Sequence, residues 1–263
     1  MKLNTAIILC GGKGTRLGIL SKKKAKTLVK IQNKEILWYL IKYLKLNGFN
    51  HFILPLGYKG DQIKKFIKKN KNFHSSFDLI NTGKNTNIGK RIYKILNKIK
   101  SDNLIILNGD AIFDFNVKKI FEFHEKKKLD ATFLSAESKY QFGTVCTKNN
   151  KLVDFKRNII FDSVNIRNDN LVRAYNYAGL IIINKNILLK YSKTFYKSEN
   201  FEKNFYPILI KKHRTEMKKI FGLFHSIDNI KDIIEGNSNS NNTYKKIFKL
   251  KIKFKKKWVE KSR

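Results

Sequence analysis

The stretch LCGGKGTRLGILSKKKAK, residues 9–26, carries most of the information about what this chain does. It follows an apolar run at residues 5–9, which has the composition of a buried strand that ends at the glycines. Glycines permit positive φ angles, and successive free backbone N–H groups in such a loop surround an anion. A threonine, an arginine and a lysine add donors and charge suited to phosphate. The stretch therefore predicts a phosphate-binding loop, although a tight strand-to-helix turn is the plainer interpretation of the glycines alone.

Two common phosphate-binding motifs are excluded by the order of residues in this loop. The Walker loop ends in Gly-Lys-Ser or Gly-Lys-Thr, whereas this chain reads Gly14-Thr15-Arg16. The dinucleotide-binding fingerprint GxGxxG is also missing. The pattern is instead GGxGTRL, followed by Lys26.

Strand-like and helix-like segments alternate over the first half of the chain. The strands are expected at 51–56, 77–81, 103–107 and 131–136, and the helices at 35–46, 59–69, 88–99 and 117–127. This alternation predicts an α/β fold with a mostly parallel, doubly wound (Rossmann-like) central sheet and helices on both faces. Ligands of such folds bind outside the carboxyl ends of the strands. Both the glycine loop and Asn108-Gly109-Asp110 fall at such ends.

The pattern changes after about residue 140. Short strands are expected at 142–148, 151–157, 176–184, 217–222 and 223–228, with helices at 201–212 and 229–236. The first three of these strands predict a small mixed β sheet that covers one side of the cleft, and the polar residues 158–175 predict a loop. We expect one domain over residues 1–237, with halves 1–137 and 138–237. A polar linker and a basic tail follow at 238–263.

The net charge of +36, from 56 basic and 20 acidic side chains, has two explanations. A nucleic acid, an anionic membrane or a phosphorylated substrate would account for it. The abundance of lysine, asparagine and isoleucine along the whole chain also accounts for it, and we favour this explanation. Basic residues scattered over every face form no binding stripe, and no RNA- or DNA-binding motif is recognisable, so nucleic acid is not the expected partner. For the basic tail, weak association with a membrane surface is left open.

The location of the protein is predicted from what the sequence lacks. The two cysteines, Cys10 and Cys146, have no metal-type spacing and suggest free thiols rather than a disulfide framework. The first residues do not resemble a signal peptide, and no run approaches the roughly 20 apolar residues of a membrane span. We therefore expect a cytoplasmic protein.

Several segments together resemble one enzyme family. GGKGTRL after a first strand, then Lys26, then Gly109-Asp110 after a central strand resemble the sugar-1-phosphate nucleotidyltransferases. The resemblance is narrower to the glucose-1-phosphate cytidylyltransferases, and it extends in order from about residue 5 to 237. The segments that carry it are ILWYLIKYLKLNGF (36–49), GYKGDQIKKF (57–66), INTGKNTNIGKRI (80–92), FEFHEKK (121–127), FGTV (142–145), NYAGLIIIN (176–184) and SIDNIKDIIEGN (226–237).

This resemblance implies an activity. Family members join a nucleoside triphosphate to a sugar 1-phosphate and release pyrophosphate. A phosphate oxygen of the sugar attacks the α-phosphorus in line, so no enzyme nucleophile is needed, and catalysis consists of positioning and charge neutralisation. The substrates implied for this chain are a nucleoside triphosphate, CTP favoured, and a sugar 1-phosphate, glucose 1-phosphate favoured, for surface polysaccharide biosynthesis. Magnesium is the implied cofactor, and a homo-oligomer is the expected assembly.

The resemblance also implies roles for residues that match the family motifs. Arg16 and Lys26 would be catalytic, and Asp110 and Asp228 would hold magnesium. The remaining expected site residues are, for the nucleotide, Leu9, Gly11, Gly12, Gly14, Thr15, Thr82, Gly83, Arg91 and Gly109, and, for the sugar phosphate, Gly143, Lys156, Arg157, Asn176 and Gly179. Plainer interpretations stay open at this stage: Asp110 as a turn residue, Asp228 as a helix N-cap, and Arg91 as one exposed cation among many.

The sequence departs from the family pattern at several places, of which three concern the site. The family lysine stands in Pro-Lys-Pro, but here it stands in Ala25-Lys26-Thr27. In the segment that recognises the base, Ile88 and Lys90 replace a threonine and a glycine. Asn158 aligns with the lysine that clamps the sugar phosphate, so we expect Lys156 or Arg157 to replace it.

These departures leave other functions open. One is the same chemistry with a heptose or another sugar 1-phosphate and GTP, UTP or dTTP. The others are a basic nucleic-acid-binding protein and an inactive relative.

Overall fold

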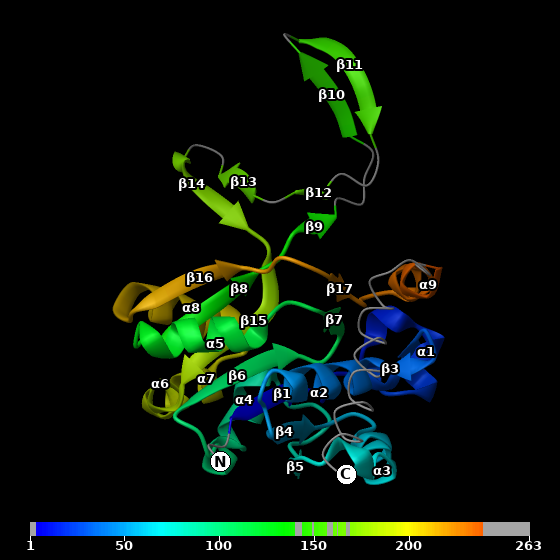
Figure 1. The fold of residues 1–263 in the computed structure, drawn as a ribbon, viewed down its shortest axis with the longest axis vertical. Coiled ribbons are helices and arrows are strands. Elements are labelled where there is room, and N and C mark those ends of the chain that lie inside the picture. Colours follow the sequence, from blue (N-terminus) through cyan, green and yellow to red (C-terminus); the bar gives the residue numbers. More distant parts are fainter. Residues whose placement is uncertain are drawn as a thin grey trace, which may run out of the picture.

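The computed structural model describes residues 4–139, 144–148, 150–156, 160–161, 163–166 and 169–238. A seven-stranded sheet lies at its centre, in the strand order β16-β8-β15-β6-β1-β4-β5 (Figure 1). The bounds of these strands are β1 (Thr5–Leu9), β4 (His51–Leu56), β5 (Ser76–Asn81), β6 (Asn103–Asn108), β8 (Ala131–Ser135), β15 (Tyr177–Asn184) and β16 (Thr215–Lys219).

The sheet is mostly parallel. β1 pairs in parallel with β4 and β6, β4 with β5, and β8 with β16, whereas β15 runs antiparallel between β6 and β8. The inner strands β1 and β6 are apolar along nearly their whole length because both of their faces are covered by helices. The predicted fold class is confirmed.

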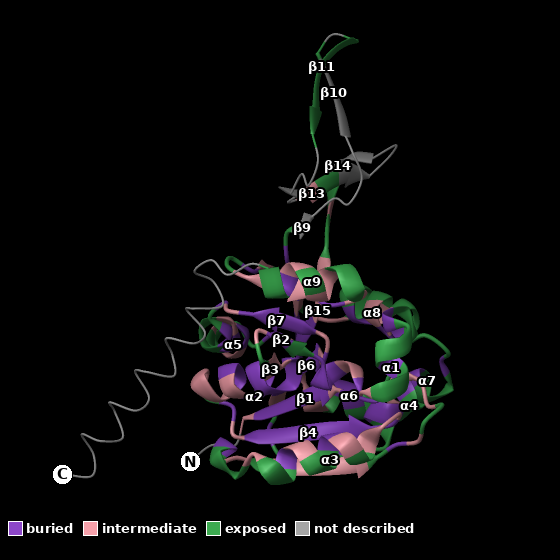
Figure 2. Ribbon diagram, turned by 90° about the vertical axis from the view of Figure 1, so that its right-hand side faces the viewer, coloured by how far each residue is buried: buried purple, intermediate pink, exposed green. Residues whose placement is uncertain are grey.

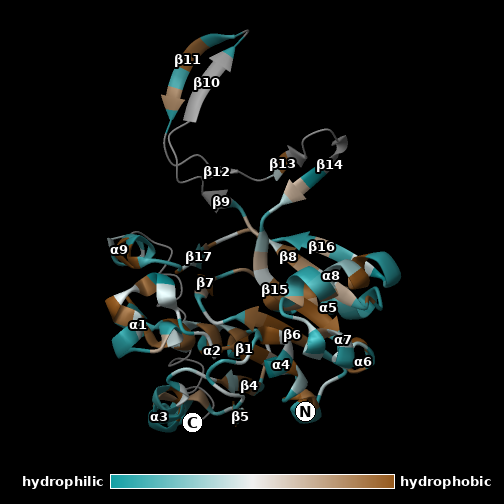
Figure 3. Cartoon of the chain, turned by 180° about the vertical axis from the view of Figure 1, so that it is seen from behind, coloured by the Kyte–Doolittle hydropathy of each residue, from teal (hydrophilic) through white to brown (hydrophobic). Residues whose placement is uncertain are grey.

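Helices cover both faces, and each face has its own core. Ala6 and Ile8 face one cluster and Ile7 the other, because side chains alternate across a strand. The first cluster packs under α2 (Ile36–Leu46), α3 (Gly60–Lys69) and α5 (Val117–Lys126). The second packs under α4 (Ile88–Tyr93), α6 (Lys185–Lys190), α7 (Ser192–Lys197) and α8 (Phe201–Lys212). Figure 2 shows the buried strands between these layers. Figure 3 shows that α3 is mostly hydrophilic, whereas β1 and β6 are hydrophobic.

Shorter elements lie at the edges of this body. They are α1 (Ile19–Lys23), α9 (Ile230–Ser238), the hairpin of β2 (Lys30–Ile31) and β3 (Lys34–Glu35), and the antiparallel pair of β7 (Ala111–Phe113) and β17 (Phe224–Ser226). Four 3-10 helices occur at η1 (Thr15–Leu17), η2 (Lys26–Leu28), η3 (Lys71–Phe73) and η4 (Leu96–Lys98). Among the described residues, no helix is both long and apolar enough to cross a membrane.

Two expectations for the second half are corrected. The segment 176–184 does not join a small separate sheet, because its apolar run, as β15, fills the central sheet between β6 and β8. Residues 158–175 do not form a plain loop: where they are described, they contain β12 (Ile160–Phe161), β13 (Ser163–Ile166) and β14 (Asp169–Tyr175). The polar composition of this segment did not indicate these strands.

The remaining strands form two-stranded pairs that project from the body (Figures 1 and 2). β9 (Ser138–Lys139) pairs with β12, β10 (Thr144–Lys148) with β11 (Lys151–Lys156), and β13 with β14, all antiparallel. We call residues 144–156 the arm. The residues of β11 are all exposed, so β11 contributes nothing to either core. The division at residues 137 and 138 stays a prediction, and the basic tail lies outside the described residues.

Candidate active site

The glycine loop leaves β1 at the carboxyl edge of the sheet. Gly14 has a φ of 64°, in the left-handed region, and it begins η1. At the neighbouring strand end, the N–H of Gly109 donates to the carbonyl of Leu9 at 3.2 Å. A Cβ atom on residue 109 would lie 2.6 Å from that carbonyl oxygen, so only glycine permits this close approach. The loop and Asp110 are therefore adjacent, as the sequence predicts.

The outer part of the loop is open. Gly12, Thr15 and Arg16 are exposed, and a Cβ atom on residue 12 would meet nothing within 4 Å. The Arg16 side chain is 80% exposed, and its Nη1 lies 3.9 Å from Oδ1 of Asp228. A phosphate chain can therefore reach the loop from solvent.

Lys26 lies between two carboxylates. Its Nζ is 2.8 Å from Oδ2 of Asp110 and 3.0 Å from Oδ1 of Asp228, a residue 202 positions away in the chain. Its side chain is 16% exposed. Burial alone would lower the pKa of the Lys26 amine, but the Asp110 charge and the hydrogen bonds to both carboxylates outweigh it and raise the pKa. Lys26 therefore stays fully charged at neutral pH.

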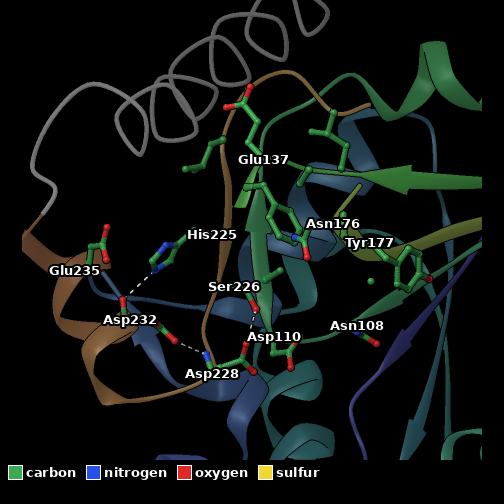
Figure 4. Close-up of a pocket in the computed structure, with 18 of the residues that line it drawn as sticks. Asn108, Asp110, Glu137, Asn176, Tyr177, His225, Ser226, Asp228, Asp232 and Glu235 are labelled. Carbon is green, nitrogen blue, oxygen red and sulfur yellow. Dashed lines mark hydrogen bonds between the residues drawn. The ribbon is translucent and has the colours of Figure 1, made fainter. Parts of the chain in front are cut away.

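The β7–β17 pair brings the two carboxylates together. Asp110 directly precedes β7 and Asp228 follows β17, and the N–H of Ile227 donates to the carbonyl of Asp110 at 2.8 Å. Ser226 Oγ donates to Asp228 Oδ2 at 3.1 Å (Figure 4). Burial would raise the pKa of Asp228, but its hydrogen bond and charge interaction with Lys26 lower it. Asp228 is therefore an ionised carboxylate aimed at Lys26.

Asp228 is not the helix cap that one interpretation of the sequence suggests. Oδ2 of Asp232 accepts hydrogen bonds from the backbone N–H groups of Asp228 at 2.7 Å and Asn229 at 2.9 Å. In return, Asn229 Oδ1 accepts from the N–H of Asp232 at 3.2 Å. This reciprocal arrangement caps α9 and leaves the carboxylate of Asp228 available.

Arg91 is not an exposed cation. It is 4% exposed, and its guanidinium donates to the carbonyl of Leu56 at 3.2 Å, to Thr82 Oγ1 at 2.6 Å and to the carbonyl of Gly11 at 3.0 Å. All three acceptors are uncharged. A Cβ atom on either Gly11 or Gly57 would collide with the guanidinium. Burial lowers the pKa of Arg91, and the side chain supports the glycine loop from inside the protein.

A cavity of about 1140 Å³ opens beside the two carboxylates (Figure 4). The expected sugar-side residues Asn176 and Gly179 both line it. Gly179 has a φ of 69°, and a Cβ atom there would lie 2.5 Å from the side-chain nitrogen of Asn108. Glycine at this position thus makes room for Asn108, which also lines the cavity. The site combines a phosphate-type loop, an ion-paired lysine and a cavity large enough for a sugar.

The comparison with protein families agrees with this geometry. The family model described as nucleotidyl transferase matches residues 5–157, more than half of the chain. The chain belongs to the nucleotidyl transferase family. The resemblance to sugar-1-phosphate nucleotidyltransferases is thereby confirmed at the level of the family.

The relatives of this nucleotidyl transferase are named for two different activities. A probable glucose-1-phosphate cytidylyltransferase of Bacillus subtilis is 26% identical, over 88% of this chain and 94% of the relative. A D-glycero-alpha-D-manno-heptose 1-phosphate guanylyltransferase of Aneurinibacillus thermoaerophilus is 29% identical, over 78% of this chain and 88% of the relative. Among solved structures, HddC from Yersinia pseudotuberculosis complexed with GMP-PN matches with a TM-score of 0.65 at 22% identity, covering 91% of this chain and 100% of that one. This structural likeness shows the fold.

Some expected site residues of the nucleotidyl transferase are not brought to the cavity. Lys156 lies at the end of β11 in the arm, where its Nζ is 3.3 Å from Asp154 Oδ2, and it is not among the residues that line the cavity. Gly143 and Arg157 lie outside the described residues. Thr82 is buried and bonded to the Leu56 carbonyl, and Gly83 follows it with a φ of 101°. These two shape the end of β5 beside Arg91.

Other cavity residues were not among the site residues expected from the sequence. They include Asn108, Glu137, Ser226, Lys231, Asp232 and Glu235. Asn108 was within reach of sequence reasoning because it precedes Gly109 at a strand end. For the others the sequence offered less indication. Asn229 followed by Asp232 is typical of a helix start, but this pattern does not show which cavity the helix faces.

The residues present fit a divalent cation. Asp110 and Asp228 converge on one point, since both bond the same amine. Among the described residues, no group of three or more histidine, cysteine, aspartate or glutamate side chains could hold a metal ion by itself. Magnesium is commonly bound by one or two carboxylates together with substrate phosphates and water. The pair therefore suits an ion that arrives with a nucleotide.

Proposed function

We propose that this nucleotidyl transferase joins a nucleoside triphosphate to a sugar 1-phosphate, with CTP and glucose 1-phosphate as the favoured pair. The observation that carries the proposal is Lys26, held between Asp110 and Asp228 where the glycine loop meets the cavity. The products are a nucleotide-sugar and pyrophosphate. The family and the names of the relatives support the class of reaction, and the choice of base and sugar is our proposal.

The chemistry assigned to these residues is positioning and charge neutralisation. A phosphate oxygen of the sugar 1-phosphate attacks the α-phosphorus, and the bond to the β-phosphate oxygen breaks, so that pyrophosphate leaves with that oxygen. The loop amides and Arg16 hold the triphosphate, and the charged amine of Lys26 neutralises negative charge that develops in the transition state. Arg91 holds the Gly11 carbonyl and thus orients the loop.

Asp110 and Asp228 would hold magnesium, which would supply positive charge to the phosphate oxygens. The side chains of Asn108 and Asn176 offer amide groups to sugar hydroxyls across the cavity. No side chain of the enzyme needs to form a covalent intermediate. Function in surface polysaccharide biosynthesis, a cytoplasmic location and a homo-oligomeric assembly stay predictions.

A second pair of substrates has specific support. One relative is named as a heptose 1-phosphate guanylyltransferase, and Ile88 and Lys90 depart from the pattern of the cytidylyltransferases in the segment expected to recognise the base. GTP with a heptose 1-phosphate is therefore the second candidate.

Pyrophosphate release tests the proposal. The purified chain with magnesium is offered CTP, GTP, UTP, dTTP and ATP in turn, each with glucose 1-phosphate and with a panel that includes a heptose 1-phosphate. Turnover with CTP and glucose 1-phosphate is the expected result. Turnover with another pair would support the proposed reaction but change the assigned substrates. If no pair in the panel releases pyrophosphate, the proposed activity is contradicted.

A further inference from the structure

The negative charge of the residues that line the cavity is unfavourable for an anionic substrate. Five carboxylates line it: Asp110, Glu137, Asp228, Asp232 and Glu235. A sugar 1-phosphate is itself an anion, and like charges repel strongly where water is partly excluded. The phosphate therefore needs a cation on the sugar side of the cavity. Lys231 is the one lysine or arginine among the described residues that line this cavity.

Nearby lysines are committed to other partners. Lys219 lies 3.4 Å from Glu137, Lys156 pairs with Asp154 in the arm, and Lys26 bonds the two catalytic-site carboxylates. Lys231, in contrast, is exposed and has no hydrogen bond or ion pair within the described part of the chain. Its amine is thus available for a ligand.

Hydrogen bonds at the start of α9 hold the backbone of Lys231 close to Asp228. Both belong to the capped start of α9, where Asp232 accepts from the N–H groups of Asp228 and Asn229. Lys231 directly precedes Asp232 in the first turn of the helix. A long lysine side chain can then reach a phosphate placed next to Asp228 without a change of the backbone.

We propose that Lys231 binds the phosphate group of the sugar 1-phosphate, in the role that the sequence assigned to Lys156 or Arg157. This inference rests on the proposed function of the same cavity. It explains how the chain tolerates Asn158 at the position of the family clamp, because the cation comes from α9 instead of from the region of the arm.

The test separates the two substrates. Initial rates are measured for Lys231→Met, which keeps most of the apolar stem but removes the charge, at varied sugar 1-phosphate and at varied nucleoside triphosphate. We expect the KM for the sugar phosphate to rise about tenfold or more, as for loss of a charged hydrogen bond. The KM for the nucleotide should change less than about twofold, and Lys231→Arg should restore most of the affinity.

Lys203→Met is the matched control. Lys203 is an exposed lysine in the first turn of α8, and it does not line the cavity. Its replacement should leave both KM values unchanged. An unchanged KM for the sugar phosphate in Lys231→Met would overturn the proposal, and so would an equal rise for both substrates. Far-UV circular dichroism and thermal unfolding establish that each variant is folded.

Direct binding keeps the inference testable if the wild type shows no turnover. Glucose 1-phosphate is then titrated by calorimetry into the wild type and into Lys231→Met. If the wild type binds glucose 1-phosphate and Lys231→Met does not, the role of Lys231 is supported. Only the proposed reaction would then be wrong. Equal binding by both proteins, or binding by neither, would overturn the role of Lys231.

Discussion

At the carboxyl edge of the sheet, Lys26 lies between Asp110 and Asp228 and faces a cavity. At the opposite edge, His51 lies between Thr5 Oγ1 at 3.0 Å and Asp78 Oδ2 at 2.8 Å, and its side chain has no exposed surface. Both are groups of polar side chains that join segments distant in the sequence. The first faces a cavity, whereas the His51 side chain is fully buried, so a polar triad is informative about function through its access to a ligand and not through its composition.

A second buried group of polar side chains, around His124, strengthens this contrast between the two edges of the sheet. His124 Nδ1 lies 2.9 Å from Thr132 Oγ1 and its Nε2 lies 3.3 Å from Asn103 Oδ1, again at the amino ends of strands. Burial lowers the pKa of His124 to about 4, so it is neutral in the folded protein at neutral pH. We therefore expect the carboxyl edge to control turnover and the amino edge to control stability.

Replacing Lys26 should give the largest effect on turnover. We expect Lys26→Met to lower kcat about 1000-fold, because it removes the charge that meets the transition state. Thermal unfolding should change little, since Asp110 and Asp228 are both partly exposed. Steady-state rates of pyrophosphate release check this, with Lys30→Met, an exposed lysine of β2, as the control. A rate within tenfold of the wild type would show that Lys26 has no catalytic part.

Arg91 should affect both quantities. We expect Arg91→Met to lower the free energy of unfolding by about 3 kcal/mol, because buried acceptors lose charged donors. The KM for the nucleotide should rise about tenfold, since the Gly11 carbonyl is no longer held and the loop loses its orientation. Urea unfolding and nucleotide kinetics measure the two effects.

The pairing of Arg91 with the glycine loop gives a stricter test. Gly11→Ala should be strongly destabilising alone, because its Cβ atom collides with the guanidinium. It should cost less when combined with Arg91→Met, which removes the obstacle. If the losses in the free energy of unfolding of the two single variants add up to the loss in the double variant, the two residues are not coupled.

His124 makes stability depend on pH. Below its ordinary pKa of 6.5, the unfolded chain binds a proton that the folded protein does not take up until about pH 4. The free energy of unfolding should therefore fall by up to about 3 kcal/mol between these pH values and then level off. His124→Gln should remove this slope in urea unfolding followed at several pH values, and an unchanged slope would assign it to other groups.

Asp78 should give the smallest effect. We expect Asp78→Asn to lower the free energy of unfolding by about 1 to 2 kcal/mol, because a charged hydrogen bond to His51 becomes a neutral one. The kcat of the folded protein should stay unchanged. A fall in kcat that exceeds the loss of folded protein would contradict the division between the two edges of the sheet.

The sequence predicted the strand ends better than the side-chain partners. The alternation of elements placed the glycine loop and Asp110 at one edge, because parallel strands share their carboxyl side. It did not predict that Lys26 pairs with both Asp110 and Asp228, since that depends on how the β7–β17 pair folds back. The burial of Arg91 was equally hidden, because its acceptors are two carbonyls and a hydroxyl distant in sequence.

The second half shows a different limit. An apolar run such as residues 176–184 predicts a buried strand but not its direction, so its antiparallel place between β6 and β8 could not be foreseen. The strands of the arm, β10 and β11, were predicted at 142–148 and 151–157, but the pattern of a strand does not show which cavity it lies beside. Lys156 of the arm consequently seemed closer to the sugar than the structure places it.

The β7–β17 pair also joins parts of the site that are synthesised far apart in time. The phosphate loop, Lys26 and Asp110 leave the ribosome early, but Asp228 follows Lys26 by 202 positions. Closing so long a loop is slow compared with forming local contacts. A nascent chain can thus form its core strands before it can hold both carboxylates. With the role that we propose for Asp228, active molecules are expected only once almost the whole described chain has emerged.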